Sequence, residues 1–382
     1  MKVYLDHGAT TPVDKEVVKA MLPYFTKDFG NASSLHQFGQ KAKEALENSR
    51  EIIAKKLNAE PKEIVFTGSG SESDNLAIKG IAYANKDKGN HIITSKIEHP
   101  AILETCKALE KEGFGVTYLD VDEEGFISLE ELKKSITNKT ILVSIMHANN
   151  EIGTIEPIEE IGKICKEKKV YFHTDAVQSF TKVPIDVKKM NVDLISLSSH
   201  KIHGPKGVGA LFIKNGTKIQ KIIYGGHHEN DKRAGTENIP GIVGFAKAAE
   251  LANEEYISHM TKLRDALIRE LEKISNSQLN GPRGNKRLCN NANLSFHFIE
   301  GESALLRLDM KGIAVSTGSA CSSQSLTPSH VLTAIGLKPE IAHGSLRFTL
   351  GRENTEKDID YVLKVLPKVV EELREISPLT KR

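Results

Sequence analysis

Residues 198–207 of this 382-residue chain read SSHKIHGPKG and place Lys201 among hydroxyl and imidazole side chains. The short apolar run Val192–Leu197 directly precedes them and predicts a buried strand. Gly204 and Pro205 end any regular element after it. A lysine at a strand end among small polar groups is well placed to act as a Schiff-base nucleophile. Taken alone, the pattern also fits a solvated loop lysine, because the chain holds 52 Lys and Arg residues.

The composition is that of an ordinary globular protein, with 39% hydrophobic and 27% charged residues. A net charge of +2 gives no reason to expect nucleic acid or an anionic membrane as the main partner. No apolar run approaches the roughly 20 residues that a membrane span requires. The cysteines form no CxxC pair, so we expect no disulfide framework, no zinc site and a cytoplasmic location. They are Cys106, Cys165, Cys289 and Cys321.

Strand and helix patterns alternate between Glu63 and Ile213, which predicts a largely parallel sheet covered by helices. Beyond Gly225 the pattern changes to an α+β arrangement that includes a predicted helix over Ile242–Tyr256. We therefore expect a large domain at residues 15–250. Residues 1–14 and 251–382 are expected to form a smaller domain.

Polar residues follow the predicted strands at their carboxyl ends, the edge where open α/β sheets bind ligands. They are Gly68–Ser71, Asn150, Asp175, Gln178 and Ser198–Lys201. The segment GSGSESDN at residues 68–75 joins a strand to a helix, and its free amides and the Ser71 hydroxyl would form a phosphate cradle. An ordinary helix cap is an equally good interpretation of this segment.

If Lys201 carries an aldehyde cofactor, these residues can supply what pyridoxal phosphate requires. Asp175 suits the protonated pyridine nitrogen, and His99 suits the face of the ring. The ring hydroxyl needs a donor, which Gln178 or Asn150 can provide. The residues that suit the phosphate are Gly70, Ser71, Ser198 and His200.

Two residues of the C-terminal part suit an amino-acid substrate. Arg347 has a planar fork that can clamp a carboxylate, although an interdomain ion pair is an equally good interpretation. Cys321 lies in TGSACSSQS, residues 317–325, where small polar neighbours predict an exposed thiol that can act as a nucleophile. Because free cysteines are more often structural, its role stays open on this basis. We expect Cys106 and Cys165 to lie in the core.

Residues 198–207 closely resemble the cofactor-lysine motif of the NifS/IscS-type cysteine desulfurases, within the class V aminotransferase family. The other motifs that resemble this group follow in order along nearly the whole chain: residues 4–6, 30–36, 149–154, 173–178, 233–238 and 318–321. Two segments depart from the usual pattern. His7-Gly8 replaces Asn-Ala or similar small residues, and GSGSES at residues 68–73 replaces SGATES, although Ser71 keeps a hydroxyl.

The resemblance implies a fold-type I pyridoxal-phosphate enzyme, with a large domain on a mainly parallel seven-stranded sheet and a smaller α+β domain. It implies Lys201 as the Schiff-base lysine, Asp175 at the pyridine nitrogen and His99 on the ring. It implies Asn150 and Gln178 near the ring hydroxyl and the substrate, and Arg347 at the substrate carboxylate. At the phosphate it implies Ser71, Ser198 and His200. In a homodimer, Thr236 is expected to reach the phosphate of the partner subunit.

The implied activity is that of a cysteine desulfurase, which converts L-cysteine to L-alanine and holds the sulfur as a persulfide on Cys321. The sulfur would pass to an iron–sulfur scaffold protein or a sulfur carrier. During this transfer Cys321 could also bind an iron–sulfur cluster. No other metal is expected. A selenocysteine lyase or another class V aminotransferase is the alternative enzyme. The alternative from another class is a catalytically silent relative that acts as an assembly subunit.

Overall fold

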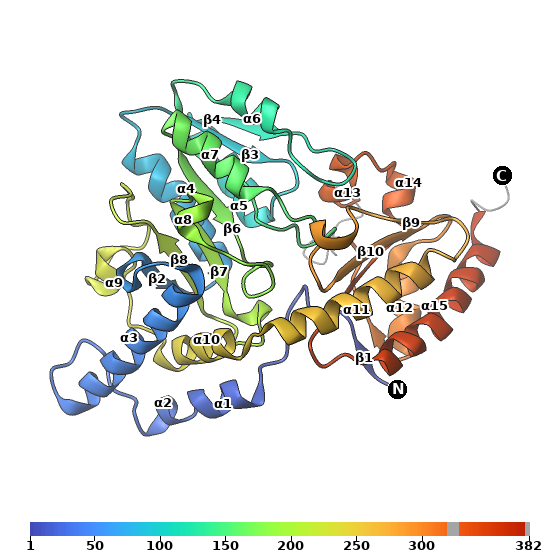
Figure 1. Ribbon diagram of the computed structural model, residues 1–382, viewed down its shortest axis with the longest axis horizontal. Coiled ribbons are helices and arrows are strands. Elements are labelled where there is room, and N and C mark those ends of the chain that lie inside the picture. The colour runs from blue at the N-terminus through green and yellow to red at the C-terminus, as the bar shows by residue number, and fades with distance from the viewer. Residues whose placement is uncertain (319–327, 379–382) are drawn as a thin grey trace.

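The computed structural model describes residues 1–318 and 328–378 (Figure 1). Its centre is a seven-stranded sheet of order β2-β8-β7-β6-β5-β3-β4. Within it, β8 pairs antiparallel with β7 and β2, and all other pairs are parallel. This confirms the predicted mainly parallel sheet. The strands are β2 (Ile64–Thr67), β3 (His91–Ser95), β4 (Gly115–Leu119), β5 (Thr140–Ser144), β6 (Tyr171–Asp175), β7 (Leu194–Ser198) and β8 (Gly209–Ile213).

Helices cover both faces of this sheet, because successive residues of a strand point to opposite sides. On β3, Ile93 belongs to the core formed with α3, α7 and α10, whereas Ile92 belongs to the core formed with α4 and α5. Burial on both faces explains the nearly continuous apolar runs of the strands. These helices are α3 (Gln37–Leu57), α4 (Gly70–Ala84), α5 (Pro100–Lys111), α7 (Ile158–Lys168) and α10 (Ile239–Leu251).

A separate core joins the N-terminal strand to the C-terminal part of the chain. It contains a parallel pair, β1-β11, and an antiparallel sheet of order β12-β10-β9. The domain limits of 15–250 against 1–14 and 251–382 stay a prediction. The elements are β1 (Val3–Tyr4), β9 (Ser277–Leu279), β10 (Asn291–Phe296), β11 (Ile313–Ala314), β12 (Ser345–Thr349), α11 (Glu254–Leu271), α12 (Gly301–Met310) and α15 (Glu356–Ile376).

The prediction of one helix over Ile242–Tyr256 is wrong, because two non-helical residues separate α10 from α11. Ala252 has an extended backbone, and the Asn253 side chain caps α11 by accepting the amide of Tyr256 at 3.0 Å. Within the described ranges, no helix is long and apolar enough to cross a membrane. The shorter helices are α1 (Lys15–Met21), α2 (Pro23–Thr26), α6 (Leu129–Ser135), α8 (Val187–Met190), α9 (His228–Asp231), α13 (His330–Ala334) and α14 (Pro339–Ala342).

A buried ion pair fastens α9 to α3 and β2. Arg50 donates from both terminal nitrogens to the Glu229 carboxylate, at 2.7 and 2.9 Å. Glu229 also accepts the amide of Phe66 on β2 at 2.8 Å. Both charged side chains are almost fully buried, so neither can exchange its partner for water.

We expect Glu229→Ala to lower the free energy of unfolding by about 3–5 kcal/mol, because it leaves Arg50 buried without a counter-charge. Denaturant unfolding followed by circular dichroism measures the change. The matched control is Glu372→Ala, which removes the partner of Arg307 in a more exposed pair and should cost below about 1 kcal/mol. Equal effects of the two substitutions would contradict this prediction.

Candidate active site

A cavity of about 260 Å³ opens at the carboxyl edge of the central sheet, where β6 and β7 end and α4 and α5 begin. Apart from Thr236 and Cys321, all the predicted site residues line it. These are Gly70, Ser71, His99, Asn150, Asp175, Gln178, Ser198, His200, Lys201 and Arg347. Gly8, Ala9 and Asp74 line the cavity too, and sequence reasoning missed them as site residues.

Lys201 ends the short 3₁₀ helix η2 (Ser199–Lys201), which follows β7 directly. Its Nζ donates hydrogen bonds to the carbonyl oxygens of Gly8, at 2.6 Å, and Ala9, at 2.7 Å. Gln178 Nε2 donates to the same Gly8 carbonyl at 3.0 Å. The N-terminal segment therefore forms a wall of the cavity, and the interpretation of Lys201 as a solvated loop residue does not fit this geometry.

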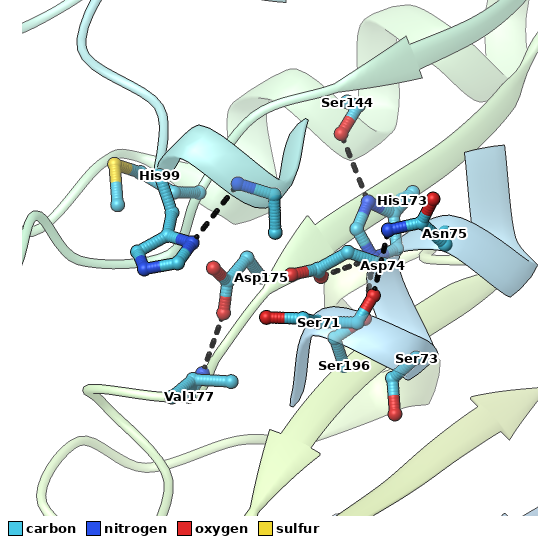
Figure 2. Close-up of polar contacts among 12 residues, drawn as sticks. Ser71, Ser73, Asp74, Asn75, His99, Ser144, His173, Asp175, Val177 and Ser196 are labelled. Carbon is cyan, nitrogen blue, oxygen red and sulfur yellow. Dashed lines mark hydrogen bonds and ion pairs between the residues drawn. The ribbon is translucent and has the colours of Figure 1, made fainter. Parts of the chain in front are cut away.

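Asp175 is the last residue of β6 and is 5% exposed. Burial raises the pKa of its carboxyl to about 6, while the amide of Val177 and the charge of Lys201 act in the opposite direction. The Val177 amide donates to Oδ1 at 2.8 Å (Figure 2). This carboxyl can therefore be ionised at neutral pH and can oppose a positive charge within the cavity.

Asp74 is the second buried carboxyl of the cavity, and it is 1% exposed. Burial is the main cause that raises its pKa, and the charge of Asp175 adds to the effect. Sequence reasoning treated Asp74 as part of a helix cap. Its spacing from Ile78 and Ile81 was the available signal, because residues at i, i+4 and i+7 share one face of a helix and that face is apolar here.

His99 caps α5, and its Nδ1 accepts the amide of Ala101 at 3.1 Å (Figure 2). Burial, the charge of Lys201 and that of His330 lower its pKa to about 4. The ring is therefore neutral at physiological pH and, since Nδ1 accepts, carries its proton on Nε2. A neutral ring suits stacking on the face of a cofactor ring.

The start of α4 forms a cradle for an anion. Gly70 is its first residue, and the first amides of a helix have no acceptor within the helix. A Cβ on Gly70 would lie 2.7 Å from Val177 Cγ2, so a side chain at this position would clash. His200 lies in η2, directly after β7. Burial and the charge of Lys201 lower the pKa of its imidazole to about 4.

Arg347 on β12 is 2% exposed and reaches the cavity from the second core. Its terminal nitrogens donate to the carbonyl oxygen of Asn150 and to Asp6 Oδ1, each at 3.1 Å. Its Nε is buried and has no hydrogen-bond partner among the described residues. Because buried donors are normally satisfied, this nitrogen indicates a place for a carboxylate ligand.

The two remaining predicted residues lie apart from this geometry. Thr236 is exposed on a single copy of the chain and does not line the cavity. Cys321 lies outside the described residues, but the chain on both sides of it is anchored near the cavity. Ser316 pairs with Arg347 through two backbone hydrogen bonds, and Ser329 donates to Glu151, the neighbour of Asn150.

Comparison with known proteins identifies the family. The class-V aminotransferase family matches residues 3–362. The chain belongs to this family. It is 62% identical to the cysteine desulfurase IscS of Clostridium botulinum strain Hall, over 99% of this chain and 96% of that protein.

Solved structures give the same result. A NifS-like protein matches with a TM-score of 0.92 and 41% identity, over 98% of this chain and all of the other. The structure of SspA in complex with cysteine matches with a TM-score of 0.84 and 40% identity, over 93% of this chain and all of that one. The predicted family and fold are thereby confirmed.

The residues of the cavity fit pyridoxal phosphate, the cofactor of this family. Asp175 offers a buried anion for the ring nitrogen, Lys201 offers an amine, and the start of α4 offers amides for the phosphate. The individual roles stay predictions. In the part of the chain that the structure describes, no group of His, Cys, Asp and Glu is arranged to hold a metal ion.

We expect the affinity for pyridoxal phosphate to fall as the pH drops below about 6, because Asp175 is then protonated and no longer opposes the ring charge. The loss should reach about tenfold one pH unit lower. Fluorescence titration of the cofactor-free protein measures it. Asp175→Asn should bind more weakly and lack this pH dependence, so an identical fall in that variant would assign the effect elsewhere.

Proposed function

We propose that this chain is a pyridoxal-phosphate-dependent cysteine desulfurase that converts L-cysteine to L-alanine and takes the sulfur onto Cys321. The observation that carries the proposal is the cavity itself. It combines Lys201, the buried Asp175 and Arg347, whose Nε has no hydrogen-bond partner among the described residues. The chain leading to and from Cys321 is anchored beside it. The similarity to proteins named cysteine desulfurase supports the same activity.

When bound, pyridoxal phosphate supplies an electron sink that stabilises negative charge on the substrate carbon. Lys201 would hold the cofactor and then move the proton of that carbon, and the neutral His99 would lie on the face of the cofactor ring. Asp175 would keep the ring nitrogen protonated. Arg347 would bind the substrate carboxylate through its buried Nε, which would orient the substrate for both steps.

The sulfur step belongs to Cys321. Its thiolate would attack the sulfur of the substrate, so that a sulfur–sulfur bond forms while the carbon–sulfur bond breaks. The electron pair of the broken bond stays with the carbon, which takes up a proton, and the product is alanine. The atoms balance as cysteine plus thiol giving alanine plus persulfide. A scaffold protein for iron–sulfur clusters or a sulfur carrier would accept the sulfur.

Two exposed features support the proposed homodimer. Leu22, Phe25, Phe29 and Leu35 expose more than half of their surface along α2 and the segment before α3. Such apolar groups typically mark a protein interface. Thr236 is exposed near α9, which the Arg50–Glu229 pair fastens to α3. Pairing of two copies across these features would cover the apolar groups and bring Thr236 to the partner's phosphate site.

A cytoplasmic location is the last part of the proposal. Cys106, Cys165 and Cys289 are free and buried, which suits a reducing compartment. The first two lie in the helical cores, as predicted.

We expect Cys321→Ala to keep the yellow colour of bound cofactor but to lose release of alanine and sulfide from cysteine, because the sulfur acceptor is gone. Lys201→Ala should slow turnover by roughly a hundredfold or more through loss of proton transfer. Assays of alanine and sulfide with a reductant measure both. Cys165→Ala, which removes a buried thiol, should retain sulfur transfer. Normal sulfide release by Cys321→Ala would exclude the persulfide step.

We expect Leu22→Asp combined with Phe25→Asp to convert the dimer to a monomer, because two charges would be buried at the interface. Light scattering after size-exclusion chromatography gives the mass. The control is Leu306→Asp on α12, which is 63% exposed and lies outside the proposed interface. A monomeric wild-type protein with bound cofactor would refute a phosphate site that two subunits share.

A further inference from the structure

Three carboxyls and a histidine are buried close enough to interact with one another, and two of them, Asp74 and Asp175, line the cavity. They are Asp74 on α4, Glu98 before α5, and His173 and Asp175 on β6, and none is more than 5% exposed. Carboxylates that share a buried site cannot all be ionised, because each negative charge opposes the next. At least one of the acids must therefore retain its proton, and the hydrogen bonds indicate which.

The donors are shared unequally among the three acids. Asp175 accepts the Val177 amide and faces the charge of Lys201. Glu98 Oε1 accepts from Ser95 Oγ at 2.7 Å and from the amide of Met146 at 2.9 Å.

Asp74 Oδ1 and Glu98 Oε2 are both buried with no hydrogen-bond partner in the described ranges, but the other oxygen of Glu98 has two donors and Asp74 has one, the Ser196 hydroxyl. An oxygen without a donor is the least favourable place for a negative charge.

His173 cannot supply the missing charge. Its Nε2 lies 3.8 Å from Asp74 Oδ1, but burial lowers the pKa of the ring to about 3. Both ring nitrogens are engaged by hydroxyls, Ser144 Oγ and Ser196 Oγ, each at 2.9 Å. Figure 2 shows this row of groups, with the Asp74 carboxyl between Asp175 and the histidine. A neutral histidine leaves an ionised Asp74 without an opposing charge.

We propose that Asp74 is a positioning residue that keeps its proton at neutral pH, so that Asp175 is the carboxylate presented to the ring nitrogen. The inference rests on the proposed function, because it gives Asp74 its role through Asp175. The neutral acid fills the space beside Asp175 without adding a second negative charge. The Ser196 hydroxyl, which hydrogen-bonds Asp74, holds the acid in place.

Infrared spectroscopy of the cofactor-free protein tests the proton directly. At pH 7, the spectrum of the wild type minus the spectrum of Asp74→Asn should show the carbonyl stretch of a protonated acid. The amide of the variant lacks this band. Glu98→Gln is the control and should leave the Asp74 band in place. Ser196→Ala keeps the carboxyl and should shift the frequency of its band, so it tests the inference even if Asp74→Asn folds poorly. Absence of the acid band from the wild type minus Asp74→Asn difference spectrum at pH 7 would overturn the inference.

Stability gives a second readout. A group whose pKa is raised in the folded state holds its proton there while the unfolded chain releases it, so stability is lost as the pH rises above about 4. The melting temperature of cofactor-free Asp74→Asn should therefore exceed that of the wild type more at pH 8 than at pH 5. Asp87→Asn, on the exposed segment after α4, should show no such widening. A constant difference for Asp74→Asn would contradict a proton on this group.

Cofactor binding separates this inference from the proposed function. Asp74→Asn should retain the wild-type affinity for pyridoxal phosphate and the wild-type absorption spectrum at pH 7, because the amide reproduces a neutral acid. Asp74→Leu, which lacks the polar group, should alter the spectrum. An altered spectrum in Asp74→Asn would overturn the positioning role. If the infrared band and the cofactor spectra behave as stated but cysteine is not turned over, the proposed function fails and the inference stands.

Discussion

Burial of the Asp175 carboxyl at the end of β6 is the constraint on which the site depends. A buried carboxylate needs donors and an opposing charge, and the fold provides the Val177 amide and Lys201. His99 and His200 are buried at the same edge of the sheet, and their imidazoles stay neutral because desolvation disfavours the imidazolium. The protonation states of the whole cavity therefore follow from how little water reaches the strand ends.

The N-terminal segment connects the second core to the cavity that contains Asp175. β1 pairs with β11 in the second core, and a few residues later Gly8 and Ala9 accept the hydrogen bonds of Lys201 at the central sheet. Arg347 adds a second connection, since it bonds to both Asp6 and Asn150. A cofactor held by Lys201 and a substrate held by Arg347 would thus be positioned by both cores at once.

Much of the fold was predictable because periodicity and strand-end chemistry are local properties. Apolar runs separated by helical patterns indicated the sheet, and parallel strands place their carboxyl ends at one edge. Asp175, Ser198 and Lys201 could therefore be grouped from residue type and position alone. Asp74 was not grouped with them, because capping chemistry explains an acidic residue near a helix start equally well. The break before α11 escaped prediction for a similar reason, since the cap at Asn253 interrupts an apolar pattern that continues across it.

Residue type and spacing along the chain were enough to indicate the family, the order of the elements, and the residues able to carry cofactor chemistry. Packing between distant elements was needed to show that Gly8 and Ala9 accept from Lys201, that Arg347 Nε is buried with no partner among the described residues, and that Asp74 shares the cavity with Asp175. Desolvation and charge coupling act through space between elements far apart in the chain. They become defined only when packing sets which groups are buried together.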